Sequence, residues 1–159
     1  MQEPHDRAVK KIHYVSCISL ALIELDSLKP SEDYDRIWAK KLKNKIYLDR
    51  QWLTPIWVES HNFIIMDGHH RYQAAKMLHL AVIPCFMLSY NFNYVKLSAW
   101  DPQKVIDKNQ IIQAALSGKL LAKKTSRHEL LLEFPEIKFP LSLLAKSSET
   151  GYSWDKITS

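Results

Sequence analysis

The stretch "FIIMDGHHRYQAAKML", residues 63–78, contains the change of pattern that decides the fold. Its first four residues form an apolar run that is typical of a buried strand. Near its end, Ala74, Ala75, Met77 and Leu78 provide apolar side chains at the spacing of a helix packed on a sheet. Asp-Gly-His-His-Arg at 67–71 separates the two patterns. The sequence therefore predicts a strand, a short polar turn and a helix over about His70 to His79.

The polar turn has the chemistry of a phosphate site. The first N–H groups of a helix lack internal partners and carry partial positive charge, which makes a helix N-terminus an anion site. Gly68 lets the backbone approach a ligand, Arg71 can form a fork on a phosphate, and His69 and His70 can donate to its oxygens. Asp67 could hold Mg²⁺ or take a proton from an attacking hydroxyl. A solvated Asp-Gly turn is the alternative that these residues leave open.

Length and composition are those of an ordinary globular domain. With 159 residues, 47% hydrophobic and 25% charged, the chain is expected to form a single domain. No apolar run approaches the roughly 20 residues of a membrane span, and the N-terminus lacks the apolar region of a secretory signal. Cys17 and Cys85 both lie in apolar runs and are interpreted as small buried residues, not as a disulfide or metal pair. A cytoplasmic location is expected.

The net charge of +5 is moderate. It suits a nucleic acid, a nucleotide or another phosphorylated small molecule as partner. Basic residues gather at 36–45 and at 119–128. The first of these segments predicts an amphipathic helix, with Ile37, Trp38 and Leu42 facing a core and the lysines facing water.

The remaining pattern predicts an α+β domain. Ser31 is a candidate N-cap for a helix that runs to about Lys45. Asp101-Pro102 is expected to open a further helix, which Gly118 would end. Pro84 indicates an edge or irregular position for its strand. Strands are predicted at 15–28 (one or two), 54–60, 63–66 (a hairpin with the previous strand, through a turn at 60–62), 81–90 and 93–100, with loop-plus-strand segments at 123–134 and 136–144.

The segment "TPIWVESHNFIIMDGHHRYQAAKMLHLAVIPC", residues 54–85, resembles the core of the ParB/sulfiredoxin superfamily, whose members bind nucleotides with a Gly-X-X-Arg helix start. DNA-segregating ParB proteins carry Gly-Glu-Arg-Arg there, and sulfiredoxins carry Gly-Cys-His-Arg with a reactive cysteine. This chain has His69 at the position of that cysteine, which disfavours sulfiredoxin activity. The resemblance implies a small mixed sheet with flanking helices: an N-terminal arm at 1–14, a catalytic domain at 15–145 and a C-terminal tail at 146–159.

Asp-Gly-His-His-Arg resembles the box of the free-serine kinases of this superfamily. "LDSLKPSE" at 25–32 resembles a family segment that ends in an essential glutamate, which would be Glu32. "KKTSRH" at 123–128 resembles a segment lining the amino-acid pocket, and "SAW" at 98–100 resembles a nearby tryptophan-bearing strand. The resemblance covers about residues 18–144. The chain is short compared with these kinases, which puts the presence of an accessory domain in doubt.

The resemblance implies transfer of a phosphoryl group from ATP or ADP to the hydroxyl of free L-serine, with Mg²⁺ as cofactor. Glu32 is favoured as general base, although the sequence leaves the order of the two acids open. The residues implied are Gly68, His69, His70 and Arg71 for the nucleotide phosphates, Glu32 and Asp67 for catalysis, Asp67 for Mg²⁺ directly or through water, and Trp100, Lys124, Thr125, Arg127 and His128 for the amino acid.

Two other functions remain open at this stage. One is a ParB-like, nucleotide-dependent protein that binds DNA or regulates, and the other is a nuclease or nucleotide hydrolase. The lack of a clear helix-turn-helix pattern after the core disfavours nucleic acid as a partner without excluding it. Fold alone does not choose among these functions. The expected protein is a monomer or homodimer without membrane contact, and the sequence does not distinguish ATP from ADP as donor.

Overall fold

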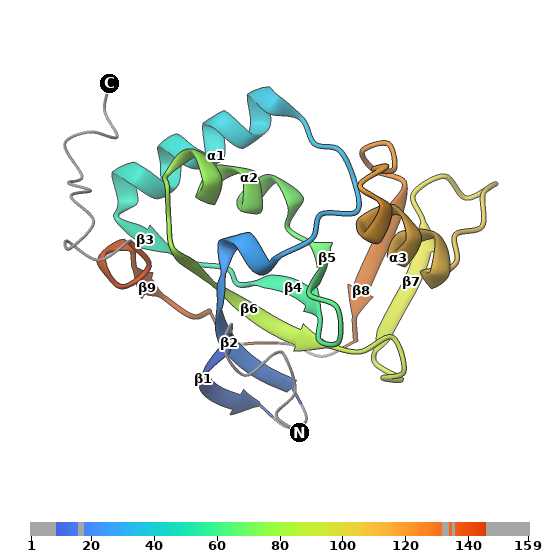
Figure 1. Cartoon of the computed structure of the whole chain (residues 1–159), viewed down its shortest axis with the longest axis horizontal. Helices are drawn as coiled ribbons and strands as arrows, with labels where there is room; N and C mark the ends of the chain where they lie inside the picture. The colour runs from blue at the N-terminus through green and yellow to red at the C-terminus, as the bar shows by residue number, and fades with distance from the viewer. Residues whose placement is uncertain (1–8, 16–17, 132–133, 135, 146–159) are drawn as a thin grey trace.

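A mixed five-stranded sheet forms the centre of the computed structural model, which describes residues 9–15, 18–131, 134 and 136–145, with side chains from residue 18 onward (Figure 1). The elements are β1 (Val9–Val15), β2 (Ile18–Glu24), η1 (Leu25–Ser27), α1 (Arg36–Asp49), β3 (Gln51–Trp52), β4 (Ile56–Glu59), β5 (Ile64–Asp67), α2 (His69–Met77), β6 (Val82–Leu88), β7 (Val95–Ala99), α3 (Lys108–Ser117), β8 (Ser126–Leu130), β9 (Phe139–Pro140) and η2 (Leu141–Leu143). The strand order is β1-β2-β6-β4-β5.

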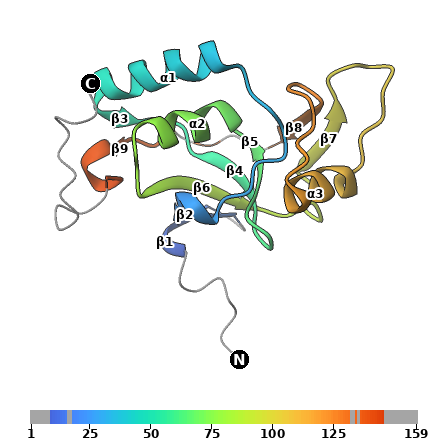
Figure 2. The same ribbon diagram turned by 45° about the horizontal axis from the view of Figure 1, so that its top comes forward.

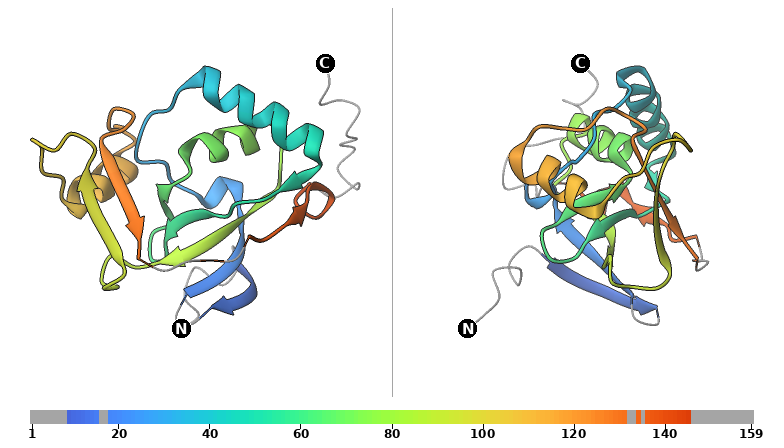
Figure 3. Two further views of the ribbon diagram at one scale, coloured as in Figure 1. Left: turned by 180° about the vertical axis from the view of Figure 1, so that it is seen from behind. Right: turned by 90° about the vertical axis from the view of Figure 1, so that its right-hand side faces the viewer.

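The helices and two small β-ribbons surround this sheet. Figure 2 shows α2 above β4 and β6, with α1 lying beyond α2. The β7–β8 ribbon and α3 sit at one end of the molecule, and the β3–β9 ribbon sits at the other, as the views in Figure 3 also show. The predicted α+β class, a small mixed sheet with flanking helices, is confirmed.

The predicted hairpin is present. Strands β4 and β5 pair antiparallel, with Val58 opposite Ile65, and the turn between them includes residues 60–62. Strand β6 runs parallel to β4, with Ile56 opposite Cys85, which makes the sheet mixed. The hairpin places the carboxyl end of β5 directly before α2, so the Asp-Gly-His-His-Arg box lies at an edge of the sheet.

Apolar side chains from the sheet and α2 form the main core. Ile23, Val58 and Ile83 have no solvent exposure, and Ala75 of α2 packs with them. Burying an aliphatic side chain of this size contributes roughly 1.5–3 kcal/mol. Cys85 is fully buried as predicted, and Cys17 lies outside the described residues.

The prediction of an edge position for Pro84 is wrong, because β6 lies between β2 and β4. The position tolerates proline because the ladder with β4 begins one residue later, at Cys85 opposite Ile56. Pro84 itself pairs only with Leu22 of β2. Proline lacks a backbone N–H. At the end of one ladder, this lack costs fewer strand hydrogen bonds than it would where a residue pairs with strands on both sides.

Helix α1 begins later than predicted. Its N-cap is Asp35, whose side chain accepts a hydrogen bond from the Trp38 N–H at 2.9 Å. Ser31, the predicted cap, is fully buried, and its hydroxyl instead donates to the carbonyl of Ile65 at 3.1 Å. The chain therefore stays extended through residues 28–35 and then turns into the helix.

The buried face of α1 differs from the predicted one. Ile37 and Trp38 were predicted to face the core, but they are 72% and 52% exposed. The buried residue is Ala39, and Leu42 is half-buried. The small side chain of Ala39 permits close packing of the helix on its buried side. The two larger apolar side chains next to it in the sequence lie on the surface.

Helix α3 also begins later than predicted, at Lys108 and not at Asp101-Pro102. Asp107 is its N-cap and forms a reciprocal capping box with Gln110, which supplies two partners for unpaired N–H groups. Gly118 ends the helix in the left-handed conformation (φ +73°), as predicted.

Strand β1 occupies much of the segment that was predicted to be an N-terminal arm. Its backbone pairs antiparallel with β2, with Val9 opposite Ile23. Residues 1–8 and the predicted tail at 146–159 lie outside the described residues. Among the residues that the structure describes, no helix has the length and apolar character needed to cross a membrane.

Candidate active site

A pocket of about 480 Å³ opens at the N-terminus of α2, against the segment at 28–35 and the turn before β8. Figure 1 shows this segment passing between α2 and the end of the molecule that carries α3 and β8. The expected site residues that line the pocket are Glu32, Asp67, Gly68, His69, His70, Trp100 and Lys124. The structure thus brings together residues from four segments that are distant in the sequence.

Backbone hydrogen bonds hold the 28–35 segment in place. The Leu121 N–H donates to the Ser31 carbonyl at 2.9 Å, and the Asp33 N–H donates to the Leu121 carbonyl at 2.8 Å. On the other side, the Ile65 N–H donates to the Lys29 carbonyl at 2.9 Å. The segment is therefore tied both to β5 and to the loop that leads into β8.

Glu32 is nearly buried at the pocket wall, with 7% of its surface exposed. Its Oε2 accepts hydrogen bonds from the Ser126 N–H at 2.8 Å and from the Ser126 hydroxyl. Hydrogen bonds to a carboxylate are among the strong ones in proteins, so two of them fix the group's orientation. Because both end on Oε2, Oε1 takes no part in this pair of bonds.

Gly68 is required by the backbone at the start of α2. Its φ of +106° is one that side-chain-bearing residues rarely adopt, and a Cβ at this position would lie 2.6 Å from Ile56 Cγ2. The backbone hydrogen bond from Tyr72 N to the Gly68 carbonyl, 2.9 Å long, begins the helix. The N–H groups at 69–71 precede that ladder and make the start of α2 an anion site beside the pocket.

Both histidines of the box accept hydrogen bonds from the backbone of the 28–35 segment. His69 Nε2 accepts from the N–H groups of Ser31 at 3.1 Å and Glu32 at 3.2 Å. His70 Nε2 accepts from the Asp35 N–H at 2.9 Å. These nitrogens are therefore occupied as acceptors for the backbone, so a hydrogen bond from either ring to a phosphate oxygen would have to come from Nδ1. Burial lowers the pKa of His69 to about 3, and it also lowers the pKa of His70.

Arg71 is likewise committed to the protein. Its Nη1 donates to the carbonyls of Thr54 and Pro55, each at 2.8 Å, and its Nη2 donates to Asp67 Oδ2 at 2.8 Å. The predicted fork on a phosphate is replaced by a fork on the backbone that precedes β4. Burial lowers the pKa of Arg71, and the nearby Asp67 charge opposes that effect. Asp67 remains about half exposed, with its side chain at 49%, so it can still meet a ligand.

The predicted serine-binding residues divide into two groups. Trp100 and Lys124 line the pocket, whereas Thr125, Arg127 and His128 do not. The Thr125 hydroxyl donates to a backbone carbonyl in its own turn at 2.5 Å. Arg127 lies over the Trp100 ring, 5.0 Å from its centroid, and is positioned behind that pocket wall.

His128 is a buried residue of β8 and not a pocket residue. It is 9% exposed, and its Nε2 lies 2.9 Å from the Tyr90 hydroxyl. Its Nδ1 is buried without a hydrogen-bond partner among the described residues. Burial lowers the pKa of His128 to about 4.

Several pocket residues were missed. Lys123 Nζ and Asp35 Oδ2 form an ion pair of 3.5 Å, and the Trp38 N–H lowers the pKa of the Asp35 carboxyl. Ser126 lies inside the "KKTSRH" segment at 123–128, so that segment could have indicated a hydrogen-bond partner for Glu32. Trp38, which was predicted to face the core, is half exposed and lines the pocket. The missed lining residues are Asp33, Asp35, Trp38, Met66, Lys123 and Ser126.

Asp67 is the side chain of the pocket that is suited to a metal ion. Among the described residues, no group of three or more His, Cys, Asp and Glu side chains could form a protein cage for a metal. Mg²⁺ usually binds through one or two carboxylates together with substrate phosphates and water. The half-exposed Asp67 beside an anion site fits that mode of binding.

The lowered pKa values of His69 and His128 predict a loss of stability in acid. The ordinary value is 6.5, and the folded values are about 3 and about 4. At a pH below 6.5 but above the folded values, these two histidines bind protons in the unfolded chain and not in the folded chain. Stability is therefore fully present above about pH 6.5 and falls as the pH drops, by up to about 1.4 kcal/mol per pH unit for each histidine.

Urea unfolding at a series of pH values measures this effect. The free energy of unfolding should fall between about pH 6.5 and about pH 4.5, and His128→Gln should make the fall less steep. A free energy that stays level over this range would contradict the neutral, buried state of both rings.

Comparison with known proteins adds three relatives, while no family model matches the chain. It is 33% identical over 98 residues to an ATP-dependent L-serine kinase of Desulfurococcus mucosus, covering 59% of this chain and 38% of that protein. It is 32% identical over 72 residues to a ParB-like protein of Sulfolobus acidocaldarius, covering 42% of this chain and 36% of that protein. It is 28% identical over 145 residues to the ADP-dependent L-serine kinase SerK of Thermococcus kodakarensis, covering 86% and 56%. The chain thus spans between about a third and three-fifths of the curated relatives it matches.

Two solved structures share the fold. A free serine kinase in complex with AMP superposes with a TM-score of 0.72 at 16% identity, over 89% of this chain and 98% of that one. SbnI with a C-terminal truncation, from Staphylococcus aureus, gives a TM-score of 0.66 at 12% identity, over 87% and 95%. The fold is shared with both. At identities this low, the superpositions show a shared fold and do not show a shared function.

Proposed function

We propose that the protein is a free L-serine kinase, which transfers a phosphoryl group from ATP or ADP to the serine hydroxyl to give O-phospho-L-serine. The observation that carries the proposal is the placement of Glu32, Asp67 and the N-terminus of α2 in one pocket. A base, a carboxylate suited to Mg²⁺ and an anion site are the parts that phosphoryl transfer requires. The similarity to two L-serine kinases supports the same assignment.

The phosphates of the donor would bind at the start of α2. Phosphoryl transfer depends on positioning and charge neutralisation more than on covalent chemistry. The N–H groups at 69–71 and the ammonium groups of Lys123 and Lys124 supply positive potential at the pocket. Mg²⁺, held by Asp67 directly or through water, would neutralise further charge on the phosphates. Arg71 contributes indirectly, because its Nη2 orients Asp67.

The acceptor hydroxyl would meet Glu32. Ser126 holds Oε2, so Oε1 is the oxygen to take the hydroxyl proton as the serine oxygen attacks phosphorus. Lys124 at the pocket is suited to the serine carboxylate, and Trp100 forms a wall that Arg127 supports from behind. In this assignment Thr125 and His128 shape the turn and strand that present those residues.

Phosphorus NMR tests the proposal directly. Purified protein with Mg²⁺, L-serine and either ATP or ADP should give a new phosphomonoester signal that requires serine. The donor that supports the signal is the physiological candidate. Loss of nucleotide with inorganic phosphate as the only product, or no reaction with either donor, would overturn the kinase assignment.

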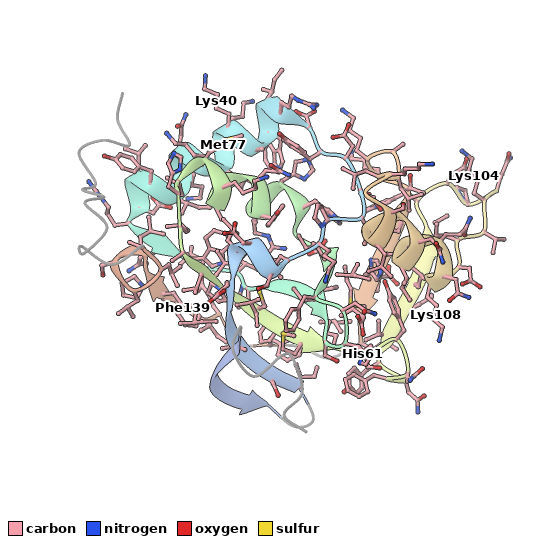
Figure 4. The ribbon with its side chains drawn as sticks, in the orientation of Figure 1. Lys40, His61, Met77, Lys104, Lys108 and Phe139 are labelled. Carbon is pink, nitrogen blue, oxygen red and sulfur yellow. The ribbon has the colours of Figure 1, made fainter. Side chains whose placement is uncertain are left out.

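A second candidate is a ParB-like, nucleotide-dependent protein that binds DNA or hydrolyses nucleotide. The similarity to a ParB-like protein favours it, as does the exposed basic face of α1, on which Figure 4 shows Lys40 pointing outward. Binding to DNA would fall steeply with salt and would survive Glu32→Gln. Equal loss of DNA binding on Glu32→Gln and on Asp67→Asn would place both acids in a nucleic-acid site and remove them from serine chemistry. The basic residues of that face are Arg36, Lys40, Lys41 and Lys45.

A further inference from the structure

We propose that His69 is a positioning residue that holds the backbone of Ser31 and Glu32, and through it the Glu32 carboxylate, against the phosphate-binding start of α2. The proposal rests on the proposed kinase function, and it assigns His69 to activation of the acceptor hydroxyl. It removes His69 from the direct phosphate contacts that the box pattern alone indicates.

The geometry around the ring carries the proposal. His69 Nε2 lies 3.1 Å from the Ser31 nitrogen, 3.2 Å from the Glu32 nitrogen and 3.3 Å from the Ser31 hydroxyl. Backbone N–H groups can only donate, so Nε2 must be the unprotonated nitrogen and the ring proton lies on Nδ1. The Ser31 hydroxyl donates to the Ile65 carbonyl at 3.1 Å, so its own proton is used elsewhere.

Without His69, two main-chain N–H groups in a largely buried segment would lose their acceptor. Ser31 is fully buried, and Glu32 is 7% exposed. Leaving buried N–H groups unpaired is unfavourable, so the segment would shift toward water or another acceptor. The Glu32 carboxylate would then leave the position that Ser126 and the pocket define.

His69 also links the two halves of the proposed reaction. It is the first residue of α2, next to the Gly68 backbone that faces the pocket, and it bonds directly to the residue that carries the base. A displacement of about 1 Å in a reacting group can lower a rate by about 100-fold. The imidazole is therefore the contact, beside the backbone bonds to Leu121 and Ile65, that sets the distance between the start of α2 and the base.

The kinetic experiment compares His69→Leu, His69→Gln and a control, His61→Leu. Leu removes the acceptor, whereas the amide oxygen of Gln can reach the region of Nε2 and accept. His61 lies in the turn of the β4–β5 hairpin, outside the pocket, and is labelled in Figure 4. The measured quantities are kcat for phosphoserine formation and the Kd of AMP or ADP by calorimetry.

The expected result is a split between rate and binding. His69→Leu should lower kcat by about 100-fold and leave the nucleotide Kd within about twofold. The kcat of His69→Gln should be at least about tenfold higher than that of His69→Leu. His61→Leu should match the unmodified protein in both quantities. A nucleotide Kd that rises as much as kcat falls would make His69 a phosphate ligand and overturn the proposal. An unchanged kcat in His69→Leu would overturn it as well.

Two further measurements do not depend on activity, and the first of them needs no variant. Nitrogen-15 NMR of the imidazole in the unmodified protein near neutral pH should show an unprotonated Nε2 and a protonated Nδ1 for His69. Hydrogen exchange at the Ser31 and Glu32 amides should be faster in His69→Gln than in His61→Leu. A protonated Nε2 would overturn the proposal. If the tautomer is as expected but the unmodified protein makes no phosphoserine, only the kinase assignment is overturned. His69 would then remain the residue that positions Glu32.

Discussion

Glu32→Gln should lower kcat for phosphoserine formation by about 10²- to 10⁴-fold, the usual contribution of a general base, while the nucleotide Kd stays within about twofold. The substitution is well matched to this site. Both hydrogen bonds from Ser126 end on Oε2, and the amide oxygen of Gln can accept them in the same place. Only the other oxygen becomes an NH₂ group, which cannot take a proton. The shape of the pocket is kept, and the proton acceptor is lost.

Steady-state kinetics and calorimetry of three variants check this result. Glu24→Gln makes the same chemical change at an exposed position outside the pocket and should leave both quantities unchanged. Asp67→Asn should also lower kcat, because it removes a carboxylate suited to Mg²⁺. If Glu32→Gln retains turnover and Asp67→Asn loses it, the base is Asp67 and the assignment of Glu32 is wrong.

The local parts of the fold could be predicted from the sequence. The β4–β5 hairpin and the start of α2 are coded within one short stretch, where an apolar run, Asp67-Gly68 and a helical spacing follow each other. Gly118 was found for the same reason, since a glycine after a helical pattern is a local signal for a left-handed cap. Elements of this kind depend on residues that are neighbours in the chain.

The errors fall where contacts with distant segments decide the structure. Ser31 has the local features of an N-cap, yet its hydroxyl binds the Ile65 carbonyl and its N–H binds His69. Those partners keep the segment extended and move the cap to Asp35. The predicted inner face of α1 was wrong for the same reason, because the elements packed on the helix bury Ala39 and leave Trp38 half exposed.

The composition of the site was better predicted than the roles of its members. Glu32, Asp67 and Gly68 do share a pocket, although Glu32 is far from the other two in the sequence. The contacts of the polar box residues within the protein were not predicted, because a histidine or arginine can bind the protein as readily as a phosphate. Arg71 binds carbonyls that come 16 and 17 residues earlier, and no local pattern indicates that choice.

Gly68→Ala should lower the free energy of unfolding by about 2–6 kcal/mol, a large share of the 5–15 kcal/mol typical of a domain. Two costs combine. A left-handed backbone conformation costs a side-chain-bearing residue about 1–3 kcal/mol, and φ at Gly68 is +106°. The added Cβ would lie 2.6 Å from Ile56 Cγ2 and 2.8 Å from Ile56 Cβ, and Ile56 is fully buried. Overpacking of a core commonly costs a further 1–3 kcal/mol or so.

Urea unfolding of Gly68→Ala beside Gly118→Ala separates these two costs. Gly118 also has a positive φ, +73°, but a Cβ there would meet no atom within 4 Å. Gly118→Ala should therefore lower the free energy of unfolding only by the cost of the left-handed backbone conformation, about 1–2 kcal/mol. The excess loss in Gly68→Ala then measures the contact with Ile56, which fixes how closely the turn at Gly68 lies on β4. Equal losses in the two variants would mean that the turn can move off Ile56, and that the anion site at the start of α2 is less rigid than the structure indicates.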